Sequence, residues 1–157
     1  MLVVYFTRTG NTEVLAETVH SVAGGDLVRI VPVDAYPADY NECLEQVQEE
    51  QRLDIRPDIT LSIDNIHEYD TIILGYPIWY GTIPTPVVTF LTSFDFSDKT
   101  IMPFCTSGGS GISGSITKIT SLCPDSKITS GLRGSSSTSA ASVASWLESD
   151  GLNGVYA

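Results

Sequence analysis

Short apolar runs alternate with segments of helical periodicity along almost the whole chain, and this alternation is the feature that most restricts the fold. The apolar runs are Leu2–Phe6, Leu27–Val31, Thr71–Leu74 and Ile101–Cys105, and a short fifth strand is expected at Lys127–Thr129. Each is short enough for a strand and is followed by a longer segment, as in units of strand, crossover helix and parallel strand. The pattern predicts an α/β fold with a doubly wound, five-stranded parallel sheet.

The segments between the runs predict five helices. We expect helices at about residues 11–23 and 39–51, a third carrying Val87–Leu91, a fourth carrying Ile112–Cys123 and a last one carrying Val143–Leu147. Residues 32–37 and a Gly/Ser-rich stretch that ends at residue 137 are predicted loops. A chain of 157 residues is typical of one domain with a single core, so we expect residues 1–157 to form one domain.

The charge of the chain argues against two classes of partner. Asp and Glu outnumber Lys and Arg by 19 to 8, and the resulting net charge of −11 is repelled by nucleic acid and by anionic membranes. Eleven of the acids lie between Asp34 and Asp70. They form either a solvated helix face or a surface on which basic partner proteins dock.

The location of the protein is expected to be cytoplasmic. The three cysteines are far apart and odd in number, which is typical of reduced thiols. No apolar run approaches the roughly 20 residues that cross a bilayer. The first predicted strand begins within two residues of Met1, so we expect no signal peptide unless one has been removed.

Three of the loops that follow predicted strands have an unusual composition. They contain "TRTGNT" after Phe6, "GYPIWYG" after Leu74 and "TSGGSGISGS" after Cys105. In a parallel sheet such loops lie at the carboxyl edge, where doubly wound proteins bind ligands. We therefore expect the three loops to form one site.

The first loop predicts a phosphate site. Gly10 allows close approach of the backbone, the Thr and Asn side chains add neutral donors, and the helix that begins at Asn11 offers unpaired N–H groups. The G-K-[ST] sequence of a P-loop is absent, which disfavours a nucleoside triphosphate with magnesium. The hydroxyl groups are also open to a second interpretation, as caps of the helix.

The other two loops predict a site for a flat ring. Trp79 and Tyr80 can form an aromatic wall, or Trp79 can pack beneath the following helix. The glycines and serines of residues 106–114 leave space for a planar ligand, or they form a flexible connector.

Other chemistries have weaker signals. Gly109, Gly111 and Gly114 have dinucleotide-fingerprint spacing, but that motif belongs after the first strand. The G-x-S-x-G motif of hydrolases is absent. The two histidines are isolated, so no metal site is predicted. No residue has the setting of a proton-transfer catalyst, and Cys105, a predicted core residue, is the cysteine nearest the expected site.

The segment T-R-T-G-N-T resembles the [ST]-x-T-G-N-T phosphate loop of the flavodoxins, whose whole length matches the alternation of strands and helices. The "GYPIWYG" and "TSGGSG" loops resemble a branch of flavodoxin-like proteins with a Trp-rich loop after the third strand. This resemblance implies strand order 2-1-3-4-5, noncovalently bound FMN and electron transfer between redox partners. Unlike many flavodoxins, the chain has no aromatic residue in the loop after the fourth strand, which leaves one face of the ring more open.

The resemblance also implies the cofactor-binding residues, carried over by position. The phosphate would be bound by Thr7, Arg8, Thr9, Gly10, Asn11 and Thr12, and the ring would be flanked by Pro77, Ile78, Trp79, Tyr80 and Gly81 and by Thr106, Ser107, Gly108, Gly109, Ser110 and Gly111.

Three functions are consistent with these residues. We favour an electron carrier that docks redox partner proteins on its acidic surface, without nucleic acid or membrane, and that is a monomer. The first alternative is an FMN-dependent NAD(P)H oxidoreductase that acts on quinones or similar small acceptors. The second is a module that binds a phosphorylated ligand without redox chemistry.

Overall fold

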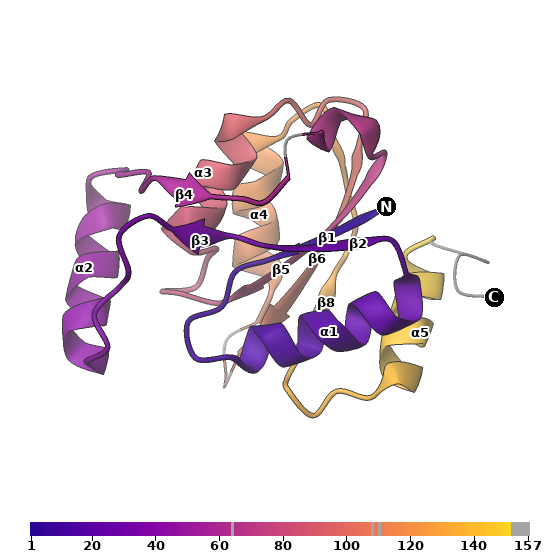
Figure 1. The fold of residues 1–157 in the computed structure, drawn as a ribbon, viewed down its shortest axis with the longest axis horizontal. Coiled ribbons are helices and arrows are strands. Elements are labelled where there is room, and N and C mark those ends of the chain that lie inside the picture. The colour runs from indigo at the N-terminus through magenta and orange to yellow at the C-terminus, as the bar shows by residue number, and fades with distance from the viewer. Residues whose placement is uncertain (64, 108, 110, 152–157) are drawn as a thin grey trace.

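A central sheet with helices on both faces forms the body of the molecule (Figure 1). The structure is a computed structural model and describes residues 1–63, 65–107, 109 and 111–151. Positions 108 and 110 of the predicted site lie outside the described residues.

Five strands follow one another across the sheet. β1 (Leu2–Tyr5) pairs in parallel with β2 (Asp26–Arg29) on one side and with β5 (Thr71–Pro77) on the other. β5 pairs with β6 (Thr100–Thr106), which pairs with β7 (Lys127–Ile128). The order β2-β1-β5-β6-β7 confirms the predicted order 2-1-3-4-5, because β5, β6 and β7 are the third, fourth and fifth predicted strands.

Two helices cover each face of this sheet. α1 (Asn11–Ala23) and α5 (Ala140–Ser149) pack on one face, and α3 (Thr85–Ser93) and α4 (Ser113–Leu122) pack on the other. α2 (Tyr40–Arg52) stands beside α3, away from the middle of the sheet (Figure 1). The fold is therefore doubly wound, as predicted.

The longest helices described, α1 and α2, have 13 residues each. Among the described residues, no helix combines the length and the apolar character that crossing a membrane requires.

Three short elements outside the central sheet were not predicted. β3 (Val31–Pro32) and β4 (Ile59–Thr60) form a separate antiparallel pair, so the predicted loop at residues 32–37 begins inside a strand. A 3-10 helix, η1 (Ile66–Glu68), precedes β5. Two-residue strands are too short to show a periodic pattern, which explains why the sequence does not reveal them.

The last strand is interrupted. After β7 the chain turns at Gly131, whose φ is 82°, and then forms β8 (Leu132–Gly134), which also pairs in parallel with β6. The predicted loop that ends at residue 137 therefore contains a strand. The Gly/Ser-rich composition around β8 concealed it.

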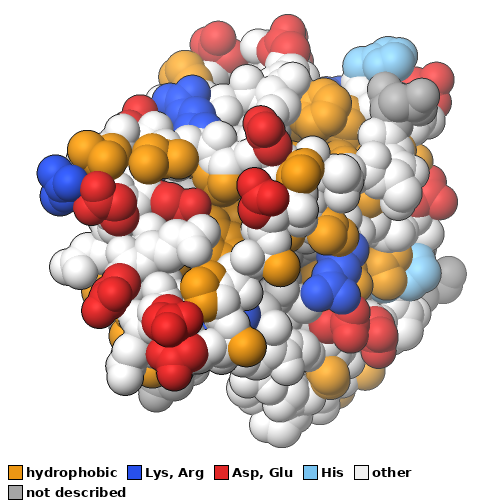
Figure 2. Space-filling view, turned by 60° about the vertical axis from the view of Figure 1, so that its left-hand side comes forward, with side chains coloured by type: hydrophobic (Ala, Val, Ile, Leu, Met, Phe, Trp, Pro, Cys, Tyr) orange, Lys and Arg blue, Asp and Glu red, His pale blue; other side chains and the backbone are white. Residues whose placement is uncertain are grey.

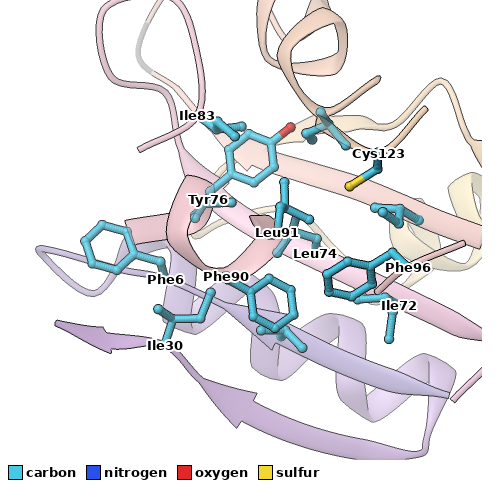
Figure 3. Packing of buried hydrophobic residues seen from close by; sticks show 14 of the residues in the cluster. Phe6, Ile30, Ile72, Leu74, Tyr76, Ile83, Phe90, Leu91, Phe96 and Cys123 are labelled. Atoms are coloured by element: carbon cyan, nitrogen blue, oxygen red, sulfur yellow. The ribbon is translucent and has the colours of Figure 1, made fainter. Parts of the chain in front are cut away.

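The core lies in two layers because side chains alternate along each strand. On one face, Phe6, Leu74 and Phe90 pack together from the end of β1, from β5 and from α3 (Figure 3). Cys105 and Cys123 belong to this layer, and burial raises the pKa of each thiol to about 11. Both thiols therefore stay protonated and poorly nucleophilic at neutral pH.

One close packing contact generates a test. Gly75 lies opposite Phe104 in the β5–β6 pair, and a Cβ atom on Gly75 would come within 2.1 Å of the Phe104 ring. We expect Gly75→Ala to lower the free energy of unfolding by roughly 1–3 kcal/mol, as overpacked cores do. Urea unfolding measures this change. Gly109→Ala is the control, since its Cβ would meet no atom within 4 Å. Equal stability of the two variants would contradict the expected clash.

Candidate functional site

The loops at the carboxyl edge of the sheet surround a cavity of about 790 Å³. This volume falls within the range of about 300–1,000 Å³ that is usual for small-molecule sites. The loops after β1, β5 and β6 all line it, together with α2 and the loop after β8. The structure thus brings the three predicted loops together.

Most of the predicted site residues line this cavity. They are Thr7, Arg8, Thr9, Asn11 and Thr12 from the first loop, Pro77, Ile78, Trp79 and Tyr80 from the second, and Thr106, Ser107 and Gly109 from the third. Gly10, Gly81 and Gly111 lie in the same loops but are not among the lining residues. That these side chains hold a cofactor stays a prediction at this point.

The first loop presents an uncapped helix terminus. Gly10 precedes α1 with a φ of 101°, and its N–H donates to Thr7 Oγ1 at 3.0 Å, before the helix begins. No side chain caps α1, and within the described part of the chain the N–H groups of residues 11–13 have no acceptor. The capping interpretation is therefore wrong for this helix. Unpaired N–H groups at a helix terminus attract an anion.

Thr106 ties the three loops to one another. Its hydroxyl group shares a buried hydrogen bond of 2.7 Å with the hydroxyl group of Thr12. Its backbone oxygen accepts a hydrogen bond of 3.2 Å from the N–H of Ile78. These two hydrogen bonds therefore fix the three loops relative to one another.

Arg8 connects the first loop to the segment that enters α2. Its guanidinium group donates to the backbone oxygens of Pro37, at 3.3 Å, and Ala38, at 3.1 Å. The next residue, Asp39, caps α2 by accepting a hydrogen bond of 3.0 Å from the N–H of Glu42. The arginine therefore helps to place α2 along the cavity.

The second loop makes a tight turn at the cavity. The backbones of Trp79 and Thr82 exchange hydrogen bonds of 3.0 and 3.2 Å, and Tyr80 and Gly81 between them have φ values of 50° and 77°. Two central residues with positive φ define a type I′ turn. Tyr80 is 51% exposed, and its hydroxyl group donates to the backbone oxygen of Leu44 at 3.3 Å.

Trp79 is both a packed residue and a wall of the cavity. Its indole meets the rings of Phe6 and Tyr36 edge to face, with centroid separations of 5.3 and 5.2 Å. It remains partly exposed and lines the cavity. Trp79 therefore forms a wall of the cavity, as predicted, and its ring packs against Phe6 and Tyr36.

Sequence reasoning missed two parts of the lining. The apolar face of α2 supplies Tyr40, Cys43, Leu44 and Val47, and the loop after β8 supplies Ser135 and Ser136. The helical spacing of the α2 residues is visible in the sequence, but the spacing does not say what the face contacts. The expectation for the cysteines is corrected: Cys43 lines the cavity, whereas Cys105 points into the core.

The surroundings of the cavity are acidic. Four carboxylates at the start of α2 and along it, those of Asp39, Glu42, Glu45 and Glu49, are exposed. Figure 2 brings the α2 side of the molecule forward and shows more acidic than basic side chains on it. Glu50 differs from its neighbours because it is buried.

The strand order and the position of the cavity define a doubly wound protein with a ligand site at the carboxyl edge of its sheet. The profile of the flavodoxin family, described as "Flavodoxin", matches residues 1–150. The chain belongs to the flavodoxin family.

Solved structures agree with this assignment. A protein of Bacteroides eggerthii assigned as a flavoprotein is 34% identical, with a TM-score of 0.87 over 95% of this chain and 96% of the other. A similarly assigned protein of Bacteroides uniformis is 32% identical, with a TM-score of 0.83 over 94% and 96%. A flavoprotein of Lactobacillus acidophilus in complex with FMN is 22% identical, with a TM-score of 0.75 over 84% and 90%, and shares the fold. No curated protein matches the chain.

The turn at the cavity generates a second test. Gly81 has a φ of 77° and open space around its Cβ position, so an alanine there meets backbone strain but no clash. We expect Gly81→Ala to lower the free energy of unfolding by about 1–2 kcal/mol. Gly111→Ala, at a glycine with open space and no positive φ, should change it by less than about 0.5 kcal/mol. Urea unfolding of both variants decides, and an unchanged Gly81→Ala protein would refute the assigned turn.

Proposed function

We propose that the protein binds FMN noncovalently in this cavity and serves as an electron carrier. The observation that carries the proposal is the joining, in one cavity, of an uncapped helix terminus to an aromatic wall made by Trp79. The FMN complex of the Lactobacillus acidophilus protein, which has the same fold, supports this choice of ligand. Bound FMN supplies one- and two-electron redox chemistry that no side chain offers.

The polar end of the cavity fits the phosphate group. The N–H groups of residues 11–13 are free of partners among the described residues, and the Thr9 and Asn11 side chains are exposed beside them. The macrodipole of α1 adds roughly half a positive charge there. A dianionic ester can thus be held by neutral donors, while Arg8 is engaged with backbone oxygens.

The apolar end fits the flavin ring. Trp79, Tyr80 and the α2 residues Leu44 and Val47 line it. Aromatic side chains offer flat surfaces for stacking, worth about 0.5–1.5 kcal/mol beyond the buried area. These residues orient the ring, and the nearby carboxylates of α2 disfavour added negative charge, which lowers the reduction potential.

We further propose that redox partners dock on the acidic α2 side. The exposed carboxylates there would steer basic proteins toward the cavity. The three free thiols are all buried, which is compatible with a reducing cytoplasm.

A second candidate function is an FMN-dependent NAD(P)H oxidoreductase that acts on quinones or similar small acceptors. The absence of any aromatic residue in positions 106–111 favours it, since a ring covered on one face only is accessible to a small reactant.

Binding of FMN is tested with the exposed polar side chains of the first loop. We expect the unmodified protein to quench FMN fluorescence on titration, and Thr9→Ala with Asn11→Ala to weaken binding by about 1.5–3 kcal/mol for each charge-assisted hydrogen bond lost. Thr18→Ala, on the same helix, should bind as the unmodified protein does, because among the described residues the Thr18 hydroxyl group donates only to the Val14 backbone oxygen. Unchanged affinity of the double variant would remove the phosphate loop from the proposal.

The two redox functions are separated by reduction kinetics. We expect NADPH alone to leave the absorbance of the FMN-loaded protein almost unchanged. NADPH together with a basic flavodoxin reductase should bleach it. The bleaching rate should fall as salt rises, because screening weakens steering between charged surfaces. Rapid bleaching by NADPH alone would favour the oxidoreductase, and a rate independent of salt would argue against acidic docking.

A further inference from the structure

We propose that the carboxyl end of α2 positions the aromatic wall of the flavin site, with Gln51 as the positioning residue that holds the Trp79 turn. The inference rests on the proposed function, which it extends to residues that do not touch the ligand.

The side chain of Gln51 holds the backbone of the turn. Its Nε2 donates a hydrogen bond of 3.1 Å to the backbone oxygen of Trp79. The same oxygen accepts the N–H of Thr82 at 3.2 Å, so both acceptor positions of this carbonyl are used. One hydrogen bond closes the turn, and the other attaches the turn to α2.

The neighbouring residue, Glu50, holds the indole through Tyr36. Glu50 is only 7% exposed, and its Oε1 accepts hydrogen bonds from the Tyr36 hydroxyl group at 2.6 Å and from Thr85 Oγ1 at 2.7 Å. Burial, reinforced by the hydrogen bond to Glu50, raises the pKa of Tyr36, so the phenol keeps the proton that it donates. The Tyr36 ring then meets the Trp79 indole edge to face at 5.2 Å.

The burial of Glu50 is costly, which argues for a specific role. Among the described residues, no salt bridge involves this carboxylate. A buried carboxylate without a cation is tolerated only where hydrogen bonds replace its hydration. Its position is thus tied to that of Tyr36 and Thr85.

The opposite side of the turn is closed by α4. A Cβ atom on Gly114 would come within 2.4 Å of the Gly81 backbone oxygen, so only glycine lets the start of α4 approach the turn this closely. The Tyr80 hydroxyl group adds a contact to the Leu44 backbone oxygen of α2. The turn is therefore held between α2 and α4.

This arrangement sets the orientation of Trp79 before any ligand enters. A wall that is already ordered spares a ligand the entropy loss of ordering it, which increases affinity. Removing the Gln51 hydrogen bond should loosen the turn while leaving the helix intact. We expect FMN to bind about three- to tenfold more weakly, which corresponds to one ordinary hydrogen bond.

The test compares Gln51→Leu with Gln48→Leu, since Gln48 is an exposed glutamine of the same helix. The two variants and the unmodified protein are labelled with 5-fluorotryptophan and measured by ¹⁹F NMR without ligand, then titrated with FMN. The chain has two tryptophans, so Trp146 on α5 serves as an internal reference. We expect the Trp79 resonance alone to shift or broaden in Gln51→Leu, together with the loss of affinity, and neither to change in Gln48→Leu.

A second variant guards against a folding defect. Gln51→Glu keeps the shape of the side chain but, ionised at neutral pH, cannot donate a hydrogen bond, so it should also disturb Trp79. An undisturbed Trp79 resonance in both Gln51 variants, or an FMN affinity equal to that of Gln48→Leu, would overturn the inference. Failure of the unmodified protein to bind FMN has a separate meaning, because it overturns the proposed function itself.

Discussion

Parallel pairing of β1, β5 and β6 is the constraint on which the rest of the structure depends. These strands are buried on both faces, so each connection must cross over a face and return to the same edge. All the loops that leave the strands consequently open together, and Thr106 joins them by hydrogen bonds to Thr12 and Ile78. The cavity is thus a result of the sheet topology.

In this cavity, different groups are proposed to bind the anion and to hold the surrounding backbone in place. Neutral N–H and hydroxyl groups face the position proposed for the phosphate, while the basic side chain of that loop, Arg8, holds backbone oxygens of the segment before α2. The charge of the first loop therefore supports structure. Acidic groups exposed on α2 surround the site with negative charge, which suits the proposed electron carrier and the proposed docking of basic partners.

The sequence was sufficient to predict the strands, the helices and the three loops, because apolar runs and glycine signals report local structure directly. The order of the strands came from the resemblance to the flavodoxins. It was insufficient where a residue's role depends on distant neighbours. The charged run containing Glu50 gave no sign that this one carboxylate is buried against Tyr36. The apolar spacing of α2 was visible, yet only the fold shows that Cys43 lines the cavity. Ser135 was hidden in the same way, because it follows a strand that the Gly/Ser-rich composition concealed.

The interruption of the last strand makes this border of the sheet less prone to aggregation. An outer strand with a continuous row of free N–H and C=O groups invites a foreign chain to add to it, which is a common start of aggregation. Here that border consists of segments of two and three residues, and the Gly131 N–H between them donates a hydrogen bond to the Asp150 carboxylate. The opposite border, β2, is guarded by charged Asp26 and Arg29. Short segments at one border and charged residues at the other thus limit pairing with a foreign chain.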